Sequence, residues 1–272
     1  MLRLAILLAL AAVLCGPQAR AQSEASQSRV LATSADLRGL EAVGRLDLGR
    51  TGFCTGALVS PTLVLTAAHC VFDARSGHPH PIDTMTFRAG LAYGASFASR
   101  GVRRMVIDPA YRNVATVDLE NVARDLALLE LDQSLDLPGI RPFPAAGRLS
   151  RGDRVTLASY GRDRAEAPTL ESGCRVLDRD SKVMLLDCDV DFGSSGAPVL
   201  IATPAGPQIV SVISAMSEGT DGRRIALAVA VEQGLARLVG EFARSPVLRP
   251  DAKRLSGTGE DRGTIRFIRP GD

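Results

Sequence analysis

Most of this chain consists of short β-type segments that follow one another without helices between them. The segments are apolar or β-branched, and glycine, proline, aspartate or serine bounds most of them. Strands without alternating helices argue against a parallel α/β sheet and predict antiparallel barrels or sandwiches. The expected strands are Ala57–Leu65, Met85–Arg88, Val102–Ile107, Leu126–Leu131, Arg154–Ser159, Val183–Cys188, Ala197–Ile201, Gln208–Ser214 and Arg224–Val231.

One helix is expected late in the chain, where apolar residues recur every three or four positions and form a stripe on one helical face. The stripe consists of Val231, Leu235, Leu238, Val239 and Phe242.

The first 21 residues have the features of an export signal. Arg3 supplies a positive start, Leu4–Leu14 is an unbroken apolar run, and Ala19–Ala21 is a small-x-small cleavage site. The apolar run is shorter than the roughly 20 residues that a membrane-spanning helix needs. We therefore expect a mature chain that begins at Gln22, is secreted or periplasmic, and has no membrane partner after the signal is removed.

Charge argues against a nucleic-acid partner. The formal net charge is +2, and removal of the signal with Arg3 and Arg20 brings it to zero. A neutral domain lacks the basic surface on which nucleic-acid binding depends. The basic residues are almost all arginine, with Lys182 and Lys253 the only lysines, and this bias is typical of a GC-rich bacterial genome.

A linker divides the body into two β halves. Ser134–Gly147 contains three prolines and two glycines and has no hydrophobic period. We expect a loose polar tail from Ser245 onward, with one short strand at Thr264–Ile268. The expected organisation is a signal peptide at 1–21, an N-terminal segment and first β half at 22–133, a linker at 134–150, a second β half with the helix at 151–244, and the tail at 245–272.

Four cysteines remain in the mature chain and form two pairs that are close in sequence: Cys54 with Cys70, and Cys174 with Cys188. An even number of cysteines in an exported chain favours disulfides. Zinc binding is the alternative interpretation, but the spacings differ from the CxxC pattern of a zinc cluster.

Histidine is scarce, and only one of the three histidines has a context that indicates catalysis. His78 and His80 flank a proline in a loop that its composition predicts to be exposed, and no third metal ligand is evident beside them. His69 ends the β-type run LVLTAAH. A serine hydroxyl becomes a nucleophile when a neutral imidazole, itself held by a carboxylate, removes its proton. Asp125, at the start of an apolar strand, is the candidate acid.

Three stretches resemble the active-site blocks of trypsin-like serine proteases with the chymotrypsin fold, and in particular the bacterial secreted branch that includes V8-like enzymes. They are CTGALVSPTLVLTAAHC, RDLALLEL and GSSGAPV, in the order His, Asp, Ser. The resemblance covers about Ala42 to Gly240. It implies an all-β fold of two antiparallel six-stranded β-barrels with a C-terminal helix. An α/β-hydrolase is disfavoured because its serine precedes its histidine.

The resemblance also implies residue roles. His69 would be the general base and acid, Asp125 would orient it, and Ser195 would be the nucleophile. The backbone amides of Gly193 and Ser195 would form the oxyanion hole. The two cysteine pairs would be disulfides that brace the histidine loop and the segment leading to the serine. Substrate binding would involve Asp189, Ser214, Ala215 and Met216.

Three features depart from the digestive enzymes of this family. Ser194 stands where those enzymes carry an aspartate that pairs with a new amino terminus, and the segment SRVLATS lacks their activation site. We therefore expect no activation driven by an ion pair. Met216 replaces a glycine and is expected to narrow the entrance to the substrate pocket.

Primary specificity is left open between two alternatives. Asp189 stands six residues before Ser195, as in enzymes that cleave after Arg or Lys, while small apolar residues are the second possibility. Asp187, Asp189 and Asp191 alternate, so a strand here would place all three on one face.

The sequence thus predicts an exported, monomeric serine endopeptidase that acts on protein or peptide substrates through an acyl-enzyme, with neither a metal nor an organic cofactor. The alternative is a catalytically inactive homologue that acts as a binding module.

Overall fold

A computed structural model of the chain describes residues 26–50, 52–114, 118–145, 147–180, 182–218 and 224–244. The predicted signal peptide at 1–21 and the predicted tail at 245–272, with its expected strand at Thr264–Ile268, lie outside the described residues.

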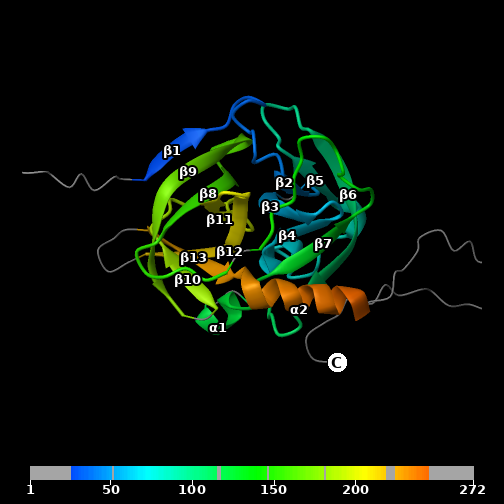
Figure 1. Cartoon of the computed structure of the whole chain (residues 1–272). Coiled ribbons are helices and arrows are strands. Elements are labelled where there is room, and N and C mark those ends of the chain that lie inside the picture. Colours follow the sequence, from blue (N-terminus) through cyan, green and yellow to red (C-terminus); the bar gives the residue numbers. More distant parts are fainter. Residues whose placement is uncertain are drawn as a thin grey trace, which may run out of the picture.

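Six of the described strands, all between residues 43 and 131, close into the first antiparallel barrel (Figure 1). Their order around the barrel is β2-β3-β4-β7-β6-β5. In β5 every second side chain is buried, the period of two expected when one face of a strand points into a core. The strands are β2 (Val43–Leu48), β3 (Phe53–Ser60), β4 (Leu63–Thr66), β5 (Met85–Ala89), β6 (Ala98–Ile107) and β7 (Ala127–Leu131).

Another six described strands form the second barrel, in the order β9-β10-β13-β12-β11-β8, and the pairing of β8 with β9 closes it. A further strand, β1 (Gln27–Val30), pairs with β9 from outside the barrel. The barrel strands are β8 (Arg154–Gly161), β9 (Arg164–Arg179), β10 (Val183–Leu186), β11 (Pro198–Thr203), β12 (Gly206–Glu218) and β13 (Arg224–Ala230). The predicted pair of six-stranded antiparallel barrels is therefore confirmed.

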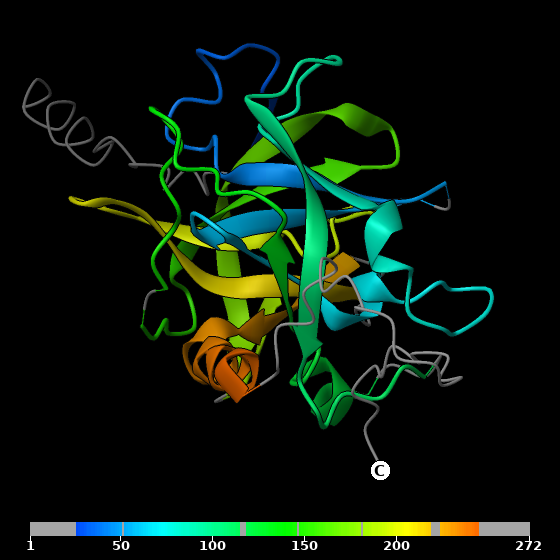
Figure 2. The same cartoon turned by 90° about the vertical axis from the view of Figure 1, so that its right-hand side faces the viewer.

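The two barrels share buried apolar contacts. One core cluster fills the first barrel and continues into the second through residues such as Tyr160, Leu200 and Val229, whereas a smaller cluster fills the second barrel alone. The predicted helix is also confirmed as α2 (Val231–Arg244), which packs against β6, β7 and β12 below both barrels (Figures 1 and 2). Among the described helices none is long and apolar enough to cross a membrane.

The connection between the barrels is irregular in the described residues 134–145 and 147–150, and it is hydrogen-bonded to both barrels. The Phe143 N–H donates to the Leu58 carbonyl of the first barrel at 2.8 Å, and the Ile209 N–H of the second barrel donates to the Pro144 carbonyl at 2.9 Å. These contacts help to hold the two barrels together.

Several strand predictions need correction. The expected strand Ala57–Leu65 is the hairpin of β3 and β4, because the chain reverses in a turn at Pro61 and Thr62. The strands β1, β2 and β9 were not predicted, and neither was the short helix α1 (Leu119–Val122). The strand β10 ends at Leu186, so the aspartates at 187, 189 and 191 do not share the face of a strand.

Candidate active site

The pairing of β4 with β7 brings His69 and Asp125 together. Thr66, the last residue of β4, lies opposite Ala127, the first residue of β7. His69 follows in a single 3-10 turn, Ala68–Val71, and Asp125 comes two residues before β7. Because the strands are antiparallel, both residues leave the sheet at the same end. The sequence expectation that this acid opens the strand therefore places it beside the histidine.

Asp125 uses both carboxylate oxygens to hold His69. Its Oδ2 lies 2.7 Å from the ring Nδ1, and its Oδ1 accepts the main-chain N–H of His69 at 2.8 Å. The Ser214 hydroxyl donates to the same Oδ2 at 2.5 Å. Asp125 is only 3% exposed, so these contacts compensate for the burial of its charge. The ring is thereby oriented with Nδ1 as the donor and Nε2 as the free base.

The pKa of His69 is raised above its ordinary value. Burial acts to lower the pKa of the ring, but the charge of Asp125 and its hydrogen bond to the ring outweigh that effect. A carboxylate beside an imidazole stabilises the protonated ring, as a general base requires once it has accepted a proton.

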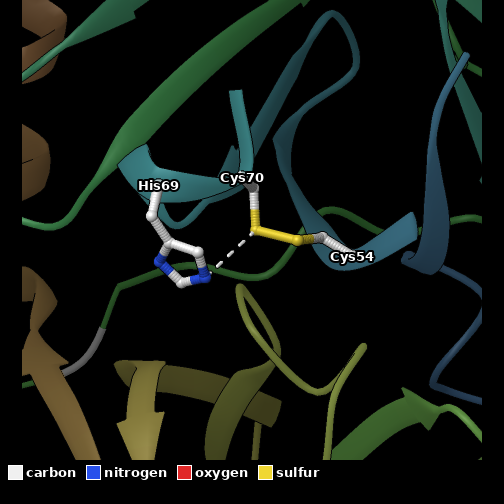
Figure 3. Close-up of side chains that lie close together, drawn as sticks. All are labelled: Cys54, His69 and Cys70. Carbon is white, nitrogen blue, oxygen red and sulfur yellow. Dashed lines mark hydrogen bonds between the residues drawn. A yellow bond between two sulfur atoms is a disulfide. The ribbon is translucent and has the colours of Figure 1, made fainter. Parts of the chain in front are cut away.

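A disulfide anchors the histidine turn to the first barrel (Figure 3). Cys70, next to His69, is bonded to Cys54 of β3, as the resemblance implied. The Cys70 sulfur lies 3.8 Å from the ring Nε2. The second expected pair, Cys174 with Cys188, is also bonded and ties β9 to the segment that leads to Ser195. Cysteines in disulfides offer no thiolate to a metal, so the zinc interpretation fails.

Ser195 lies in a tight turn between the barrels. The glycine that follows it, Gly196, has a φ of +80° and donates its N–H to the Ile213 carbonyl at 2.8 Å. A side chain on Gly196 would place its Cβ 2.1 Å from Thr66 Oγ1, so only glycine fits against β4. The turn therefore contacts Thr66 of β4, three residues before His69, and Ile213 of β12, one residue before Ser214.

The amides expected to form the oxyanion hole are free. Gly193 has a φ of +99°, and a Cβ there would lie 2.5 Å from the ring of Phe53. Within the described part of the chain, neither the Gly193 N–H nor the Ser195 N–H has a hydrogen-bond partner. Two unpartnered donors beside one serine suit an oxygen that becomes negatively charged.

Ser195 makes no hydrogen bond to His69 among the described residues. The structure therefore brings the base and the acid into contact but leaves the third expected partner unconnected. Hydrogen bonds of this kind are often long in the absence of substrate and shorten when it binds.

Ser194, at the position of the family's activation aspartate, is fully buried at 0% exposure. Its hydroxyl donates to the Tyr160 carbonyl at 3.2 Å and lies 3.3 Å from Ser159 Oγ. Its main-chain N–H donates to the Asp191 carbonyl at 2.9 Å. Neutral hydrogen bonds thus occupy the place where a charged aspartate would need a cationic partner.

A cavity of about 200 Å³ opens beside the ring of His69. The loop between β6 and β7 forms most of its wall, and sequence reasoning did not single out any residue of this loop except Asp125. Burial and the nearby Asp125 charge raise the pKa of Tyr111, which therefore stays a neutral hydroxyl in this wall. The lining residues are His69, Tyr111, Val114, Asp118, Asn121, Val122, Asp125, Ser214 and Ala215.

Only two of the four residues expected to recognise substrate line the cavity. Ser214 and Ala215 border the cavity, and Met216 follows them in β12, half-buried against the second core.

Asp189 has a side chain that is 80% exposed, and its carboxylate lies 3.9 Å from the Arg224 guanidinium. The Asp189 N–H donates to Glu171, a buried carboxyl whose pKa burial raises. Of the three alternating aspartates, Asp187 forms an ion pair with Arg175.

His80 is only 5% exposed, whereas its loop was predicted to be exposed; its main-chain N–H donates to the Val71 carbonyl and draws the loop inward.

The fold and this constellation define the class of protein, and comparison with known proteins agrees. The chain matches the model of the trypsin-like peptidase domain over residues 54–203, which is more than half of its length. The chain therefore belongs to the trypsin-like peptidase domain family.

Individual relatives cover smaller parts of the chain. A modular serine protease of Drosophila melanogaster is 40% identical over 97 residues, which are 33% of this chain and 15% of the relative. A trypsin of Phaedon cochleariae is 33% identical over 114 residues, 40% of each chain. The chain thus spans less than half the length of these relatives. A solved structure titled as a Glu endopeptidase in complex with MPD has the same fold, with a TM-score of 0.64 and 17% identity over 80% of this chain and 97% of that one.

Proposed function

We propose that this chain is an exported serine endopeptidase that hydrolyses peptide bonds through an acyl-enzyme. The observation that carries the proposal is the two-point contact between Asp125 and His69, together with a turn at Ser195 in which the Gly193 and Ser195 amides are free. Membership in a peptidase family supports the same reaction class.

In the acylation step, Nε2 of His69 takes the hydroxyl proton of Ser195 as the serine oxygen bonds to the carbonyl carbon of the substrate. The carbonyl oxygen becomes an oxyanion and accepts hydrogen bonds from the N–H groups of Gly193 and Ser195. His69 then gives the proton to the leaving amine as the C–N bond breaks, and the acyl group stays on Ser195.

In the deacylation step, His69 takes a proton from water as the water oxygen attacks the ester carbon. The same amides bind the second oxyanion. The Ser195 oxygen leaves and recovers its proton from His69, and a carboxylic acid is released. Asp125 stays ionised throughout and stabilises the imidazolium that forms in each half of the cycle.

The compartment and substrates form part of the proposal. We assign the mature protein to the periplasm or the medium, because the first 21 residues have the pattern of an export signal and the structure contains two disulfides. We further propose that it acts as a monomer. The substrates we propose are proteins or peptides that enter the cleft between the barrels.

For primary specificity we retain cleavage after Arg or Lys, with Asp189 as the recognising carboxylate. The supporting observation is that the main-chain N–H of Asp189 donates to the buried Glu171 carboxyl at 2.9 Å, so a second acidic residue lies beside Asp189. Arg224 opposes this role because its guanidinium is near the Asp189 carboxylate.

A peptide-library digest with the wild type and Ser195→Ala tests the proposal. We expect cleavage by the wild type and a loss of at least about a thousandfold in Ser195→Ala. Cleavage that survives in the alanine variant would contradict the assignment of the nucleophile.

An inactive homologue that binds peptides is the second candidate. The observation that favours it is the missing hydrogen bond between Ser195 and His69. A fluorophosphonate separates the two candidates, because it reacts with an activated serine and does not require the natural substrate.

A further inference from the structure

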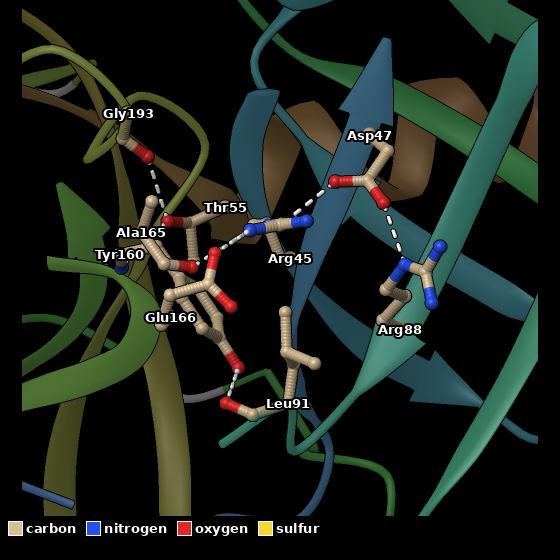
Figure 4. A network of polar contacts seen from close by, with 9 residues as sticks. All are labelled: Arg45, Asp47, Thr55, Arg88, Leu91, Tyr160, Ala165, Glu166 and Gly193. Carbon is tan, nitrogen blue, oxygen red and sulfur yellow. Dashed lines mark hydrogen bonds and ion pairs between the residues drawn. The ribbon is translucent and has the colours of Figure 1, made fainter. Parts of the chain in front are cut away.

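One threonine of the first barrel binds the nucleophile turn of the second barrel at two carbonyls. Thr55, in β3 next to Cys54, is fully buried at 0% exposure. Its hydroxyl donates to the Gly193 carbonyl at 2.8 Å (Figure 4). Its main-chain N–H donates to the Ser195 carbonyl at 2.9 Å. Both carbonyls belong to the residues whose amides are proposed to form the oxyanion hole.

The Thr55 hydroxyl has no freedom of orientation. It accepts the main-chain N–H of Tyr160 at 3.0 Å, and an amide can only donate. The single hydroxyl proton is therefore directed at the Gly193 carbonyl, which can only accept. Tyr160 is itself fixed, because its own buried hydroxyl donates to the Leu91 carbonyl at 2.9 Å.

Three hydrogen bonds hold consecutive peptide planes of the turn. Thr55 holds the Gly193 and Ser195 carbonyls, and the Ala197 N–H holds the Ser194 carbonyl between them at 3.0 Å. Because a carbonyl shares its plane with the N–H of the next residue, Thr55 fixes the planes on either side of the one that carries the Ser195 N–H. In a trans peptide the N–H points away from the C=O of the same plane. The Ser195 N–H, which shares its plane with the Ser194 carbonyl, must therefore point away from Ala197, and it is one of the free amides of the turn.

The neighbours of Thr55 in β3 reinforce the contact. Phe53 lies on the same side of the strand as Thr55, since alternate residues of a strand share a face. The Phe53 ring packs against Gly193 so closely that a Cβ on this glycine would lie 2.5 Å from it. Cys54, between them, is bonded to Cys70 beside His69. One short stretch of β3 thus contacts the nucleophile turn and anchors the histidine turn.

We propose that Thr55 is a positioning residue that sets the oxyanion hole from the opposite barrel. This inference rests on the proposed function. Ser194 cannot form the ion pair that orders this turn in the digestive enzymes. The turn is ordered here without it, through a neutral buried hydroxyl. Thr55 touches no reacting atom and acts through the orientation of the 193–195 turn.

The test compares Thr55→Val, which replaces the hydroxyl with a methyl group, with Thr55→Ser, which retains the hydroxyl. Loss of a whole oxyanion donor costs ~10²–10³ in kcat, and we expect the looser turn of Thr55→Val to lose ~10- to 100-fold in kcat. KM should change by less than about threefold, because the interaction acts in the transition state. Thr55→Ser should stay within about threefold of the wild-type kcat.

Two further readouts separate positioning from folding. Affinity for a peptide boronic acid, which mimics the tetrahedral state, should fall with kcat in Thr55→Val, while inhibition by the product peptide stays unchanged. Thr169→Val is the matched control, because the buried Thr169 hydroxyl has no hydrogen-bond partner within the described residues. This control should keep wild-type kcat and boronic-acid affinity.

Each outcome decides between the claims. A wild type that cleaves no peptide and takes no fluorophosphonate contradicts the proposed function and this inference with it. An active wild type whose Thr55→Val variant keeps kcat and boronic-acid affinity contradicts the role of Thr55 alone. If Thr55→Val does not fold, Thr55→Ala lacks the same hydroxyl without adding a methyl group, and the same kinetic loss is expected from its folded fraction.

Discussion

Asp125 binds His69 at two points, through the ring Nδ1 at 2.7 Å and through the main-chain N–H at 2.8 Å. The carboxylate therefore fixes both the tautomer of the ring and the position of the turn that carries it. An amide in its place can accept one of these bonds but presents an NH₂ group to the other.

We predict that Asp125→Asn lowers kcat by ~10³–10⁴ with little change in thermal stability, because the ring is left in the wrong tautomer. Steady-state kinetics and thermal unfolding measure the two effects. A variant that retains more than about a tenth of wild-type kcat would show that Asp125 does not orient the base.

The raised pKa of His69 predicts how kcat/KM falls at acidic pH. Only the neutral ring can accept the serine proton, so kcat/KM should rise with pH through a pKa above the ordinary 6.5. A group whose pKa is raised by folding contributes stability below 6.5 that is lost as the pH rises through the folded pKa. A pH–rate profile measures the limb, and an apparent pKa at or below 6.5 would contradict the proposed contact with Asp125.

The lowered pKa of His80 predicts that its contribution to stability depends on pH in the opposite direction to that of His69. Burial lowers the pKa of its ring, against smaller contributions from Asp73 and from Phe72. The folded protein then binds fewer protons than the unfolded chain, so this contribution is complete above pH 6.5 and is lost as the pH falls through the folded pKa. Urea unfolding of the wild type and His80→Gln should show a steeper loss below pH 6.5 in the wild type. Equal slopes would sink the prediction.

Asp189 and Arg224 make a specificity prediction. If Asp189 receives a basic substrate side chain, Arg224 competes with that side chain for the same carboxylate. We expect Arg224→Ala to raise kcat/KM for Arg and Lys peptides about two- to fivefold, and Asp189→Ala to lower it by a similar factor, since exposed ion pairs are worth up to about 1 kcal/mol. Unchanged preference in Asp189→Ala would remove this residue from substrate recognition.

Local signals predicted an antiparallel β fold and the candidates His69 and Asp125, whereas the two six-stranded barrels and the role of Ser195 were implied by the resemblance to trypsin-like proteases. LVLTAAHC and RDLALLEL each place a functional side chain at the end of an apolar strand, and that placement is what the pairing of β4 and β7 requires. The aspartate and the histidine could therefore be paired before their distance was known.

Other features depend on how distant segments pack. Thr55 follows a cysteine in an ordinary strand, and its contact with Gly193 exists only because the two barrels dock. The long strand β9 contains Pro168 and Gly173, which hide its periodicity, and its pairing with β8 and β10 holds it extended. His80 lies in a polar loop that folds inward through a main-chain bond, which composition does not reveal.

The central claim is that Ser195 is activated by His69. The most direct measurement is labelling of the folded protein with a fluorophosphonate, followed by mass mapping of the modified residue. The account predicts near-stoichiometric labelling at Ser195, no labelling in Ser195→Ala and strongly slowed labelling in His69→Ala. A folded wild type that stays unlabelled, or a label that persists in Ser195→Ala, would contradict it.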